Sequence, residues 1–287
     1  MTADILPYHL QVCHHLYACG RLIKTLSTEQ VNVSEKGPED YVTNIDHALD
    51  QYLTAAFGQM FPQDGIITEE NALSRQLFYA NYDRLWLIDP LDGTEDFIAG
   101  KADYAVMVGV LQGDQPVAGW IYAPAYNRLY YGGSQWGLFQ IDGDQAPEPL
   151  PIQPPQPPSA DPCPMILGDR DRHNYGDAIR YHLPTAQLYT LGSFGLKVLE
   201  VIQGRAGLYV YLNGRVKLWD TTGPLALAQA AGIVCCDLEG NPISFQPHAI
   251  NPDNLAHRQP IVIGWQAYID ALLPKLQKAV SQVRDAR

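Results

Sequence analysis

The sequence predicts an α/β protein built from two lobes, an α+β lobe followed by an α/β lobe. In the first half, two segments with apolar residues at helical spacing precede a series of short apolar strands. Residues 146–164 contain nine prolines, a density that is incompatible with regular hydrogen bonding and typical of a stiff connector. Beyond residue 165, strands alternate with helical segments. We therefore expect lobes over residues 1–145 and 165–287, with the connector between them.

The first lobe begins with two predicted amphipathic helices, Leu6 to Leu26 and about Asn44 to Gly58, the second capped by Thr43 or Asn44. The stretch VSEKGPEDYVTNID between them is polar, and no element is predicted there before the second helix. Strands are expected at 66–68, 84–88, 104–111, 117–122, 129–131 and 137–139. Neighbouring strands joined by short turns favour a mostly antiparallel sheet.

The second lobe shows the alternation more clearly. Strands are expected at 165–167, 188–190, 208–211, 233–237 and 261–263. Helices are expected at 175–181, 195–203, 222–231 and 266–284. This order predicts an α/β lobe, and we find no internal repeat in the sequence.

Composition and charge narrow the class of partner. The chain has 287 residues, 46% hydrophobic and 17% charged, with a net charge of −12. Such a charge argues against nucleic acid polymers and anionic membranes, but not against a small phosphorylated substrate, because bound cations would reverse the local field. Five cysteines without a C-x-x-C pair, and no long apolar run, predict a cytoplasmic protein. Neither a monomer nor a dimer is favoured by the sequence.

Acidic residues stand at the ends of several predicted elements. In WLIDPLDGTEDF, an apolar strand ends at Asp89 and Asp92, directly before Gly93 and Thr94. Oxygen ligands at this density suit a hard cation such as Mg²⁺, although Pro, Asp and Gly are also ordinary turn residues. The others are Asp46 at a helix start, Glu69 and Glu70 after a strand, and Asp220 in LWDTTGP. Asp46 and Asp220 could instead be helix caps.

Four stretches together resemble the inositol monophosphatase superfamily: DYVTNID, ITEEN, WLIDPLDGTEDF and WDTTGPLALAQAAG. They occur in the family's order and spacing, and the resemblance covers roughly residues 1–240. It implies a layered α-β-α-β-α sandwich, the fold type of inositol monophosphatases and fructose-1,6-bisphosphatases. It also implies a Mg²⁺-dependent phosphomonoesterase that is inhibited by Li⁺. One departure is Thr68, where the family usually has glycine.

The resemblance assigns metal ligands residue by residue. Glu69, Asp89 and the carbonyl of Leu91 would hold a first Mg²⁺. Asp89, Asp92 and Asp220 would hold a second. Glu69 and Asp46 would orient a third ion or a water molecule. Two ions about 3.5–4 Å apart would neutralise the phosphoryl oxygens, activate the attacking water and stabilise the leaving group.

The same resemblance implies roles in proton transfer and phosphate binding. Thr94, hydrogen-bonded to Asp46, would take the proton of the attacking water, with Glu69 assisting. The backbone N–H groups of Gly93 and Thr94 would receive phosphate oxygens, because glycine allows a close approach. No covalent intermediate is expected, since water is the nucleophile.

Substrate preference is predicted from the C-terminal half. Inositol monophosphatases usually have a glutamate seven residues before the aspartate of the WD motif, where this chain has Asn213. Lys197 in GSFGLK and Lys217 in KLWDTTGP resemble the 3'(2'),5'-bisphosphate nucleotidases, which remove the 3'-phosphate from 3'-phosphoadenosine 5'-phosphate to leave AMP. Ser193 and Asn213 are further candidates for contact with the substrate. Lys197, Arg215 and Lys217 would bind the second phosphate.

Three alternatives stay open at this point. Glu95 stands where the nucleotidase branch usually has lysine, and GDRDRH matches its Ser-Arg-Ser-His segment only loosely. Lys197 and Lys217 could also be solvated surface charges, and the enzyme an inositol or sugar phosphatase. A binding protein that has the fold but lost catalysis is a remote alternative, because every catalytic position is intact.

Overall fold

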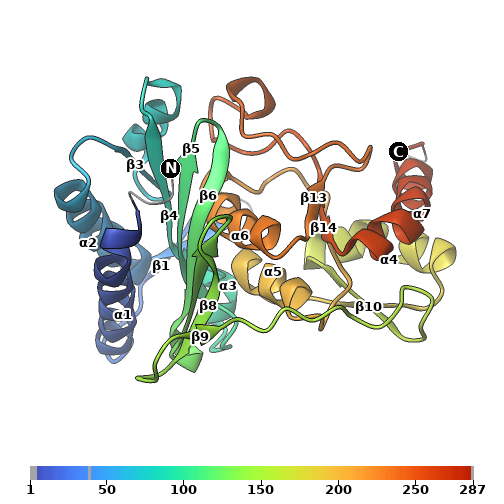
Figure 1. Cartoon of the computed structure of the whole chain (residues 1–287), viewed down its shortest axis with the longest axis horizontal. Coiled ribbons are helices and arrows are strands. Elements are labelled where there is room, and N and C mark those ends of the chain that lie inside the picture. The colour runs from blue at the N-terminus through green and yellow to red at the C-terminus, as the bar shows by residue number, and fades with distance from the viewer. Residues whose placement is uncertain (1–4, 38–39, 286–287) are drawn as a thin grey trace. The chain divides into compact units, whose positions relative to one another are not determined.

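The computed structural model describes residues 5–37 and 40–285 and divides into two compact units (Figure 1). The first unit comprises Met1–Leu150, Gly192–Leu196 and Lys217–Leu227. The second comprises the remaining segments, 151–191, 197–216 and 228–287. The first unit's long N-terminal part thus ends within the predicted connector. The segment 217–227 carries Asp220, which we had placed in the C-terminal lobe, and it clusters with the first unit.

The first unit is built on a seven-stranded sheet. Its strands, in spatial order, are β3 (Gly65–Thr68), β4 (Arg84–Asp92), β5 (Ala105–Gln112), β6 (Gln115–Ala123), β7 (Arg128–Gly133), β8 (Gly137–Asp142) and β9 (Glu148–Pro149). β3 pairs with β4 in parallel, and each later pairing is antiparallel. The prediction of a mostly antiparallel sheet is confirmed.

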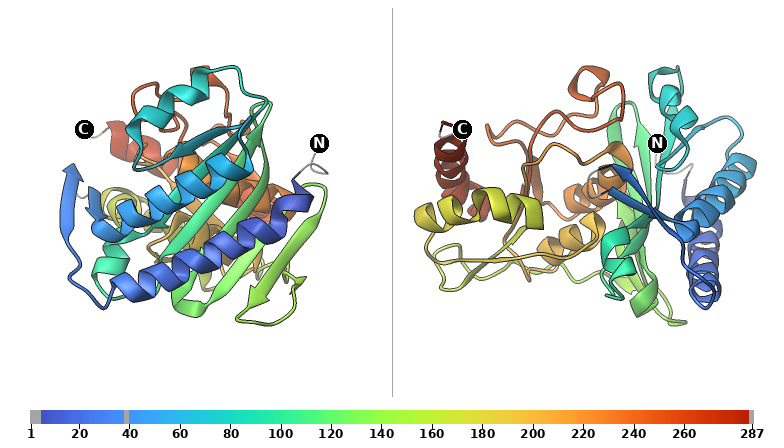
Figure 2. Two further views of the ribbon diagram at one scale, coloured as in Figure 1. Left: turned by 90° about the vertical axis from the view of Figure 1, so that its left-hand side faces the viewer. Right: turned by 180° about the vertical axis from the view of Figure 1, so that it is seen from behind.

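Helices α1 (His9–Leu26) and α2 (Asn44–Met60) lie across one face of this sheet (Figure 2, left). Their apolar stripes bury Leu16, Leu49 and Phe57 against Trp86 and Trp120 of the sheet. Short helical turns complete the unit: η2 (Leu6–Tyr8), η3 (Ala72–Tyr79), α3 (Thr94–Ile98) and η4 (Pro124–Tyr126). Full burial of such large side chains contributes about 1.5–3 kcal/mol each, so this face is the core of the unit.

The second unit has a five-stranded sheet in the order β11 (Ala186–Tyr189), β10 (Cys163–Leu167), β12 (Leu208–Tyr211), β14 (Ile261–Gly264) and β13 (Val234–Cys236). β10 runs parallel to β11 and β12, whereas β14 is antiparallel to its neighbours. Helices α4 (Asp169–His182) and α7 (Gln266–Asp285) pack on it through one apolar cluster. A short turn, η5 (Pro247–Ala249), follows β13. The predicted α/β alternation is confirmed.

Two helices are shared between the units along the chain. α5 (Phe194–Ile202) begins in the first unit and continues in the second, and α6 (Leu218–Ala230) does the same. α6 begins four residues earlier than the predicted start at residue 222. Asp220 is therefore the third helical residue, and its Oδ2 accepts a hydrogen bond from the backbone N–H of Lys217 at 2.6 Å. Asp220 is not the N-cap itself. As in a capping box, its carboxylate accepts the hydrogen bond of the backbone N–H of Lys217, the residue before the helix.

The polar stretch before α2 contains a hairpin that the sequence did not predict. β1 (Val33–Gly37) pairs antiparallel with β2 (Asp40–Thr43). Residues 33–36 are exposed, so the strand has no apolar face and shows no alternation. Such a strand leaves no periodic signal in the sequence.

Two further observations concern the chain as a whole. Within the described residues, no helix combines the length and the apolar character needed to cross a membrane. All five cysteines are buried free thiols.

Candidate metal centre

A β-bulge in β4 presents Asp89 and Asp92 to the same face of the sheet. Asp89 pairs with Met107 and Asp92 pairs with Ala105, so one extra residue of β4 is accommodated between the two pairs. In a regular strand, residues three apart would point to opposite faces. The extra residue restores the same side for both carboxylates, as bulges near active sites commonly do. The strand expected at 84–88 continues through Asp92, because the bulge absorbs Pro90 and Leu91.

Glu69 is placed next to Asp89 by the parallel pairing of β3 and β4. Its N–H donates to the carbonyl of Ile88 at 3.1 Å, so the ladder continues one residue beyond β3. Thr68, the departure from the family pattern, is fully buried, and its N–H donates to the hydroxyl of Ser74 at 3.1 Å. The Glu69 backbone is thus held to the strand that carries Asp89.

Asp220 reaches the same place because α6 packs very closely on the sheet. A Cβ atom added at Gly109 of β5 would lie 2.3 Å from the nitrogen of Gly223, and one at Gly119 would lie 2.3 Å from its carbonyl oxygen. Only glycines permit backbones to approach this closely. Along β4 and β5, Trp86 and Val108 face the α1–α2 core, so the alternate residues face α6.

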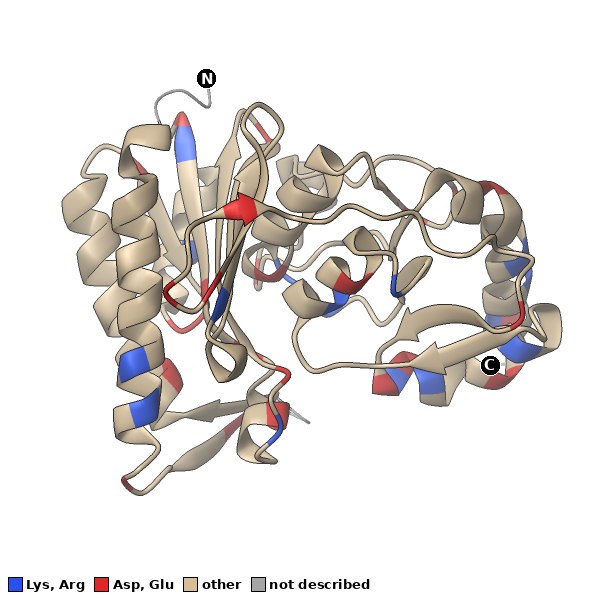
Figure 3. Cartoon of the chain, turned by 60° about the horizontal axis from the view of Figure 1, so that its bottom comes forward, with Lys and Arg blue, Asp and Glu red and all other residues tan. Residues whose placement is uncertain are grey.

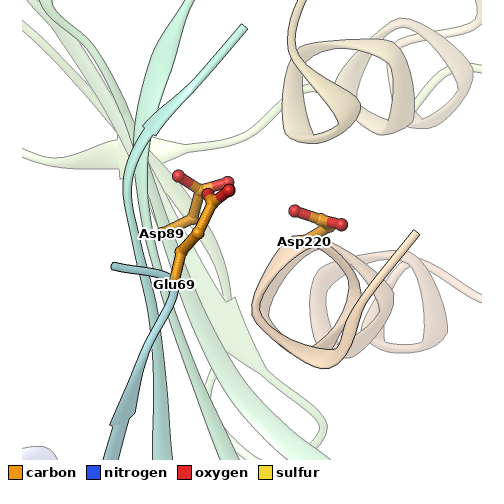
Figure 4. A group of neighbouring side chains, drawn as sticks. All are labelled: Glu69, Asp89 and Asp220. Carbon is orange, nitrogen blue, oxygen red and sulfur yellow. The ribbon is translucent and has the colours of Figure 1, made fainter. Parts of the chain in front are cut away.

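Glu69, Asp89 and Asp220 form a compact cluster in which one carboxylate oxygen from each lies within 4.8 Å of the others. Figure 4 shows Glu69, which directly follows β3, beside Asp89 of β4, with Asp220 opposite them on its helix. Burial raises the pKa of Asp89 well above its usual range, and repulsion from Glu69, Asp92 and Asp220 adds to the effect. Burial likewise raises the pKa of Asp220 to about 7, although the nearby Lys217 opposes the shift. Neighbouring carboxylates in a buried site cannot all be charged without a cation.

Asp46 and Thr94 form a second polar group beside this cluster. The Thr94 hydroxyl lies 3.0 Å from Asp46 Oδ1 and 2.9 Å from the carbonyl oxygen of Leu91. Asp46 also completes a capping box on α2, because its Oδ2 accepts from the N–H and the hydroxyl of Thr43. Asp46 can therefore serve both as a capping residue and in the site, because Oδ2 completes the capping box while Oδ1 accepts from Thr94.

Asp92 accepts hydrogen bonds from the residue before α5 and from the first turn of that helix. Its Oδ2 accepts hydrogen bonds from the hydroxyl of Ser193 and, at 3.2 Å, from the N–H of Gly195. The Ser193 oxygen also accepts from the N–H of Leu196 at 3.2 Å, which makes it the N-cap of α5. Ser193 is fully buried. The structure therefore gives Ser193 a structural contact with Asp92, beside the substrate contact expected from the sequence.

Gly93 connects the bulged strand to α3 in a conformation that favours glycine. Its φ is +91°, and an added Cβ would lie 2.8 Å from the carbonyl oxygen of Asp103 and 3.1 Å from the nitrogen of Ser193. Any side chain here would be strained and would displace the Ser193 segment. Because Gly93 has no side chain, nothing of its own covers its backbone N–H.

Lys36 is a residue that the sequence analysis missed. Its Nζ lies 2.8 Å from Glu69 Oε1 and 2.8 Å from Glu70 Oε1. Burial and the neighbouring Glu69 raise the pKa of Glu70 to about 7, while Lys36 opposes the shift. Lys36 lies on β1, which has no periodic pattern, so only its charge beside an acidic motif could have indicated it.

The remaining candidates for substrate binding lie in different units. Lys217 belongs to the first unit, and its Nζ lies 5.7 Å from the ring centroid of Trp219. Lys197, in the second unit, is only 7% exposed and lies over the ring of Tyr209 at 5.7 Å. Lys197 is therefore not a solvated surface charge. Arg215, also in the second unit, is exposed.

Asn213 of the second unit is held by its own loop. Its Oδ1 accepts from the N–H of Arg215 at 3.2 Å, and its Nδ2 lies 3.5 Å from Asp171 Oδ2. Asp171 is fully buried and accepts from the N–H of Leu212 at 2.7 Å. Burial raises the pKa of Asp171, and the hydrogen bonds oppose this. Because Asn213 carries an amide, this position offers no carboxylate to a ligand.

The donor set of the cluster fits Mg²⁺. All three clustered side chains are carboxylates, and no thiol or imidazole is among them. The chain has 31 acidic and 19 basic residues, and Figure 3 marks the acidic ones red and the basic ones blue. Clustered carboxylate oxygens are hard donors, and they favour a hard divalent cation such as Mg²⁺ over softer metals.

The chain matches a known family along most of its length. The model described as the inositol monophosphatase family matches residues 11–281. A curated relative from Aggregatibacter actinomycetemcomitans, named 3'(2'),5'-bisphosphate nucleotidase CysQ, is 29% identical over 266 residues, covering 87% of this chain and 93% of the relative. A relative from Aquifex aeolicus, named fructose-1,6-bisphosphatase/inositol-1-monophosphatase, is 25% identical over 205 residues, covering 70% and 74%.

Solved structures give the same fold. The Thermotoga maritima IMPase superposes with a TM-score of 0.75 at 21% identity, covering 98% of this chain and 99% of that one. The fold predicted from the four motifs is therefore confirmed.

Proposed function

Because this chain belongs to the inositol monophosphatase family and is a phosphoric monoester hydrolase, we propose that it is a Mg²⁺-dependent 3'(2'),5'-bisphosphate nucleotidase. Its substrate would be 3'-phosphoadenosine 5'-phosphate, which it would hydrolyse to AMP and phosphate. The observation that carries this choice is Asn213, whose amide is held by Asp171 and Arg215 where an inositol phosphatase would present a glutamate. The similarity to CysQ relatives supports the same choice.

We assign the metal ligands to the carboxylate cluster. Glu69, Asp89 and the carbonyl of Leu91 would hold one Mg²⁺, and Asp89, Asp92 and Asp220 a second. A third ion would be held by Glu69 and Asp46. Bound Mg²⁺ would neutralise phosphoryl oxygens and make water more acidic.

The chain's own residues would move the proton. The Thr94 hydroxyl lies within hydrogen-bonding distance of Asp46 Oδ1. In this role Thr94 would accept a proton from the attacking water while its own proton passes to Asp46, and Glu69 would assist. The arrangement follows the usual logic of a hydroxyl oriented by a carboxylate. The N–H groups of Gly93 and Thr94 would bind the departing phosphate.

The second phosphate distinguishes this substrate from simple monoesters. Lys197, Arg215 and Lys217 would bind it through charge-assisted hydrogen bonds. Ser193 would contribute chiefly by holding Asp92 in place.

We also propose a cytoplasmic location. The five cysteine thiols are free and buried, as expected in a reducing compartment.

A phosphate-release panel tests the proposal. We expect 3'-phosphoadenosine 5'-phosphate to be hydrolysed with a higher kcat/KM than inositol 1-phosphate, fructose 1,6-bisphosphate or NADP in the presence of Mg²⁺. A chelator should abolish the reaction and Li⁺ should inhibit it. A preference for inositol 1-phosphate or fructose 1,6-bisphosphate would instead favour the alternative function, which the Aquifex relative supports. Absence of hydrolysis of all four would favour a binding protein.

A further inference from the structure

The indole of Trp219, directly before Asp220, lies beneath two cations of the first unit. Arg75 Cζ is 5.5 Å from the ring centroid, and Lys217 Nζ is 5.7 Å from it. Trp219 is only 1% exposed. Tryptophan offers the best aromatic face for a cation–π contact, and both cations lie within the ~6 Å at which that attraction acts. Arg75 is therefore tied to the start of the helix that carries Asp220.

Arg75 also contacts the backbone of the opposite metal ligand. Its Nη2 donates a long hydrogen bond, 3.4 Å, to the carbonyl of Glu69. The backbone N–H of Glu69 donates to the carbonyl of Ile88, the residue immediately before Asp89. Ser74, the neighbour of Arg75, holds this loop by donating its hydroxyl to the carbonyl of Asn71 at 2.7 Å. The Glu69 backbone is thus fixed by hydrogen bonds on both sides.

We propose that Arg75 is a positioning residue of the metal centre, which sets the separation of Glu69 and Asp220 before an ion binds. The inference rests on the proposed metal-dependent function. The clustered carboxylates repel one another, so a site without its ion tends to open. A cation placed on the backbone side of Glu69 and on the indole beside Asp220 opposes that opening, and it leaves the carboxylate oxygens for the metal.

Metal binding without substrate tests this role directly. In calorimetric titration with Mg²⁺, Arg75→Met should weaken binding about five- to tenfold, as expected when a charged hydrogen bond and a cation–π contact are lost together. Arg75→Lys keeps the charge but not the planar fork, so it should lie between wild type and Arg75→Met. In the metal-free protein, Arg75→Met should also speed deuterium uptake by peptides spanning residues 66–72.

Arg84→Met is the matched control. Arg84 is likewise a partly buried arginine of the first unit: its Nε lies 2.6 Å from Asp64, and its Cζ lies 5.9 Å from the Phe61 ring centroid. Its removal should lower the melting temperature but leave Mg²⁺ affinity within about twofold, because Arg84 lies five residues before Asp89, about 16 Å along a strand. A loss in Arg84→Met equal to that in Arg75→Met would overturn the proposal.

The remaining outcomes separate the proposal from the function. Wild-type affinity in Arg75→Met would overturn the positioning role while leaving the nucleotidase proposal intact. Mg²⁺ binding by wild type without hydrolysis of any phosphate ester would refute the proposed function but not the role of Arg75. No Mg²⁺ binding by wild type would overturn both. If Arg75→Met does not fold, Trp219→Phe, which removes the indole face, must show the weakened binding instead.

Discussion

At the scale of single residues, Asp92 combines a structural and a proposed catalytic role on one carboxylate. One oxygen is bonded to Ser193 and Gly195, and the group also raises the pKa of Asp89 and Asp220 by repulsion. A carboxamide can accept the same two hydrogen bonds but carries no charge. The two roles can therefore be separated by a nearly isosteric substitution.

We predict that Asp92→Asn loses more than about tenfold in kcat, at least ~1.4 kcal/mol of transition-state stabilisation. The metal-free variant should melt at the wild-type temperature or higher, because one repelling charge is gone. Steady-state kinetics and thermal melts measure both. Asp142→Asn, which breaks an exposed pair with Arg128, is the control and should change neither. Retention of more than a tenth of the wild-type rate would show that Asp92 is not a ligand.

Lys217 separates the two substrate classes. If it binds the second phosphate, Lys217→Ala should lower kcat/KM for 3'-phosphoadenosine 5'-phosphate about ten- to hundredfold, the value of a charged hydrogen bond. Hydrolysis of inositol 1-phosphate should change much less. Lys197→Ala and Asn213→Glu are measured on the same two substrates, and we expect Asn213→Glu to favour the inositol ester. Equal losses on both substrates would leave no basis for a bisphosphate nucleotidase.

At the scale of elements, the position of Asp220 depends on how closely α6 approaches β5 and β6. That approach requires glycine on both sides, at Gly109, Gly119 and Gly223. The carboxylate on the helix reaches Glu69 and Asp89 on the strands only while this spacing is kept. A single methyl group in the contact would therefore act on a site that it does not touch.

We predict that Gly109→Ala destabilises the protein by roughly 1–3 kcal/mol, as overpacking does, and weakens Mg²⁺ binding by moving Asp220. Gly58→Ala is the control, since Gly58 lies in α2 with no atom within 4 Å of an added Cβ. It should stabilise the protein by about 0.5–1 kcal/mol, because alanine is the better helix former. Denaturant melts and calorimetry would measure both. Unchanged metal affinity in Gly109→Ala would mean that α6 tolerates the shift.

The elements also show what a sequence can predict. The long helices and most strands of both sheets followed from periodicity, because each has an apolar face to bury. The sequence missed β9 (Glu148–Pro149), which is exposed and pairs with β8 inside the predicted connector. The bulge at Pro90 and Leu91 and the hairpin of β1 and β2 did not, because register and exposed pairing leave no apolar pattern. For the same reason, the acidic residues could be named from their motifs, but Lys36 and Arg75 could not. Their contacts depend on tertiary packing alone.

At the scale of the whole molecule, the chain carries a net charge of −12, and three of its carboxylates gather in one cluster. The pKa of Asp89 is raised well above its usual range and that of Asp220 to about 7, with burial the largest cause for each. A carboxyl group whose pKa is higher in the folded state than in the unfolded state binds more protons when folded. Stability then falls as pH rises from the unfolded pKa, near 4, through the folded pKa.

We predict that the metal-free protein melts at a lower temperature at pH 8 than at pH 5, by about 2–4 °C for each kcal/mol lost. Saturating Mg²⁺ should remove most of this difference, since the ion replaces the protons. Differential scanning calorimetry across this range, with and without chelator, would measure it. Asp220→Asn should flatten the metal-free profile. A metal-free melting temperature that rises between pH 5 and pH 8 would contradict the raised pKa values.

The discontinuity of the first unit has a consequence for how the protein is made. Its long N-terminal part ends at Leu150, but its sheet receives α6 only from Lys217–Leu227. On the ribosome, which adds roughly 5–20 residues per second, the glycine face of β5 and β6 stays uncovered for several seconds after its strands have emerged. A nascent chain in that interval carries Glu69 and Asp89 without Asp220 and exposes sheet surface to neighbouring chains. The metal centre is thus finished late in synthesis, and its completion coincides with the covering of this sheet surface.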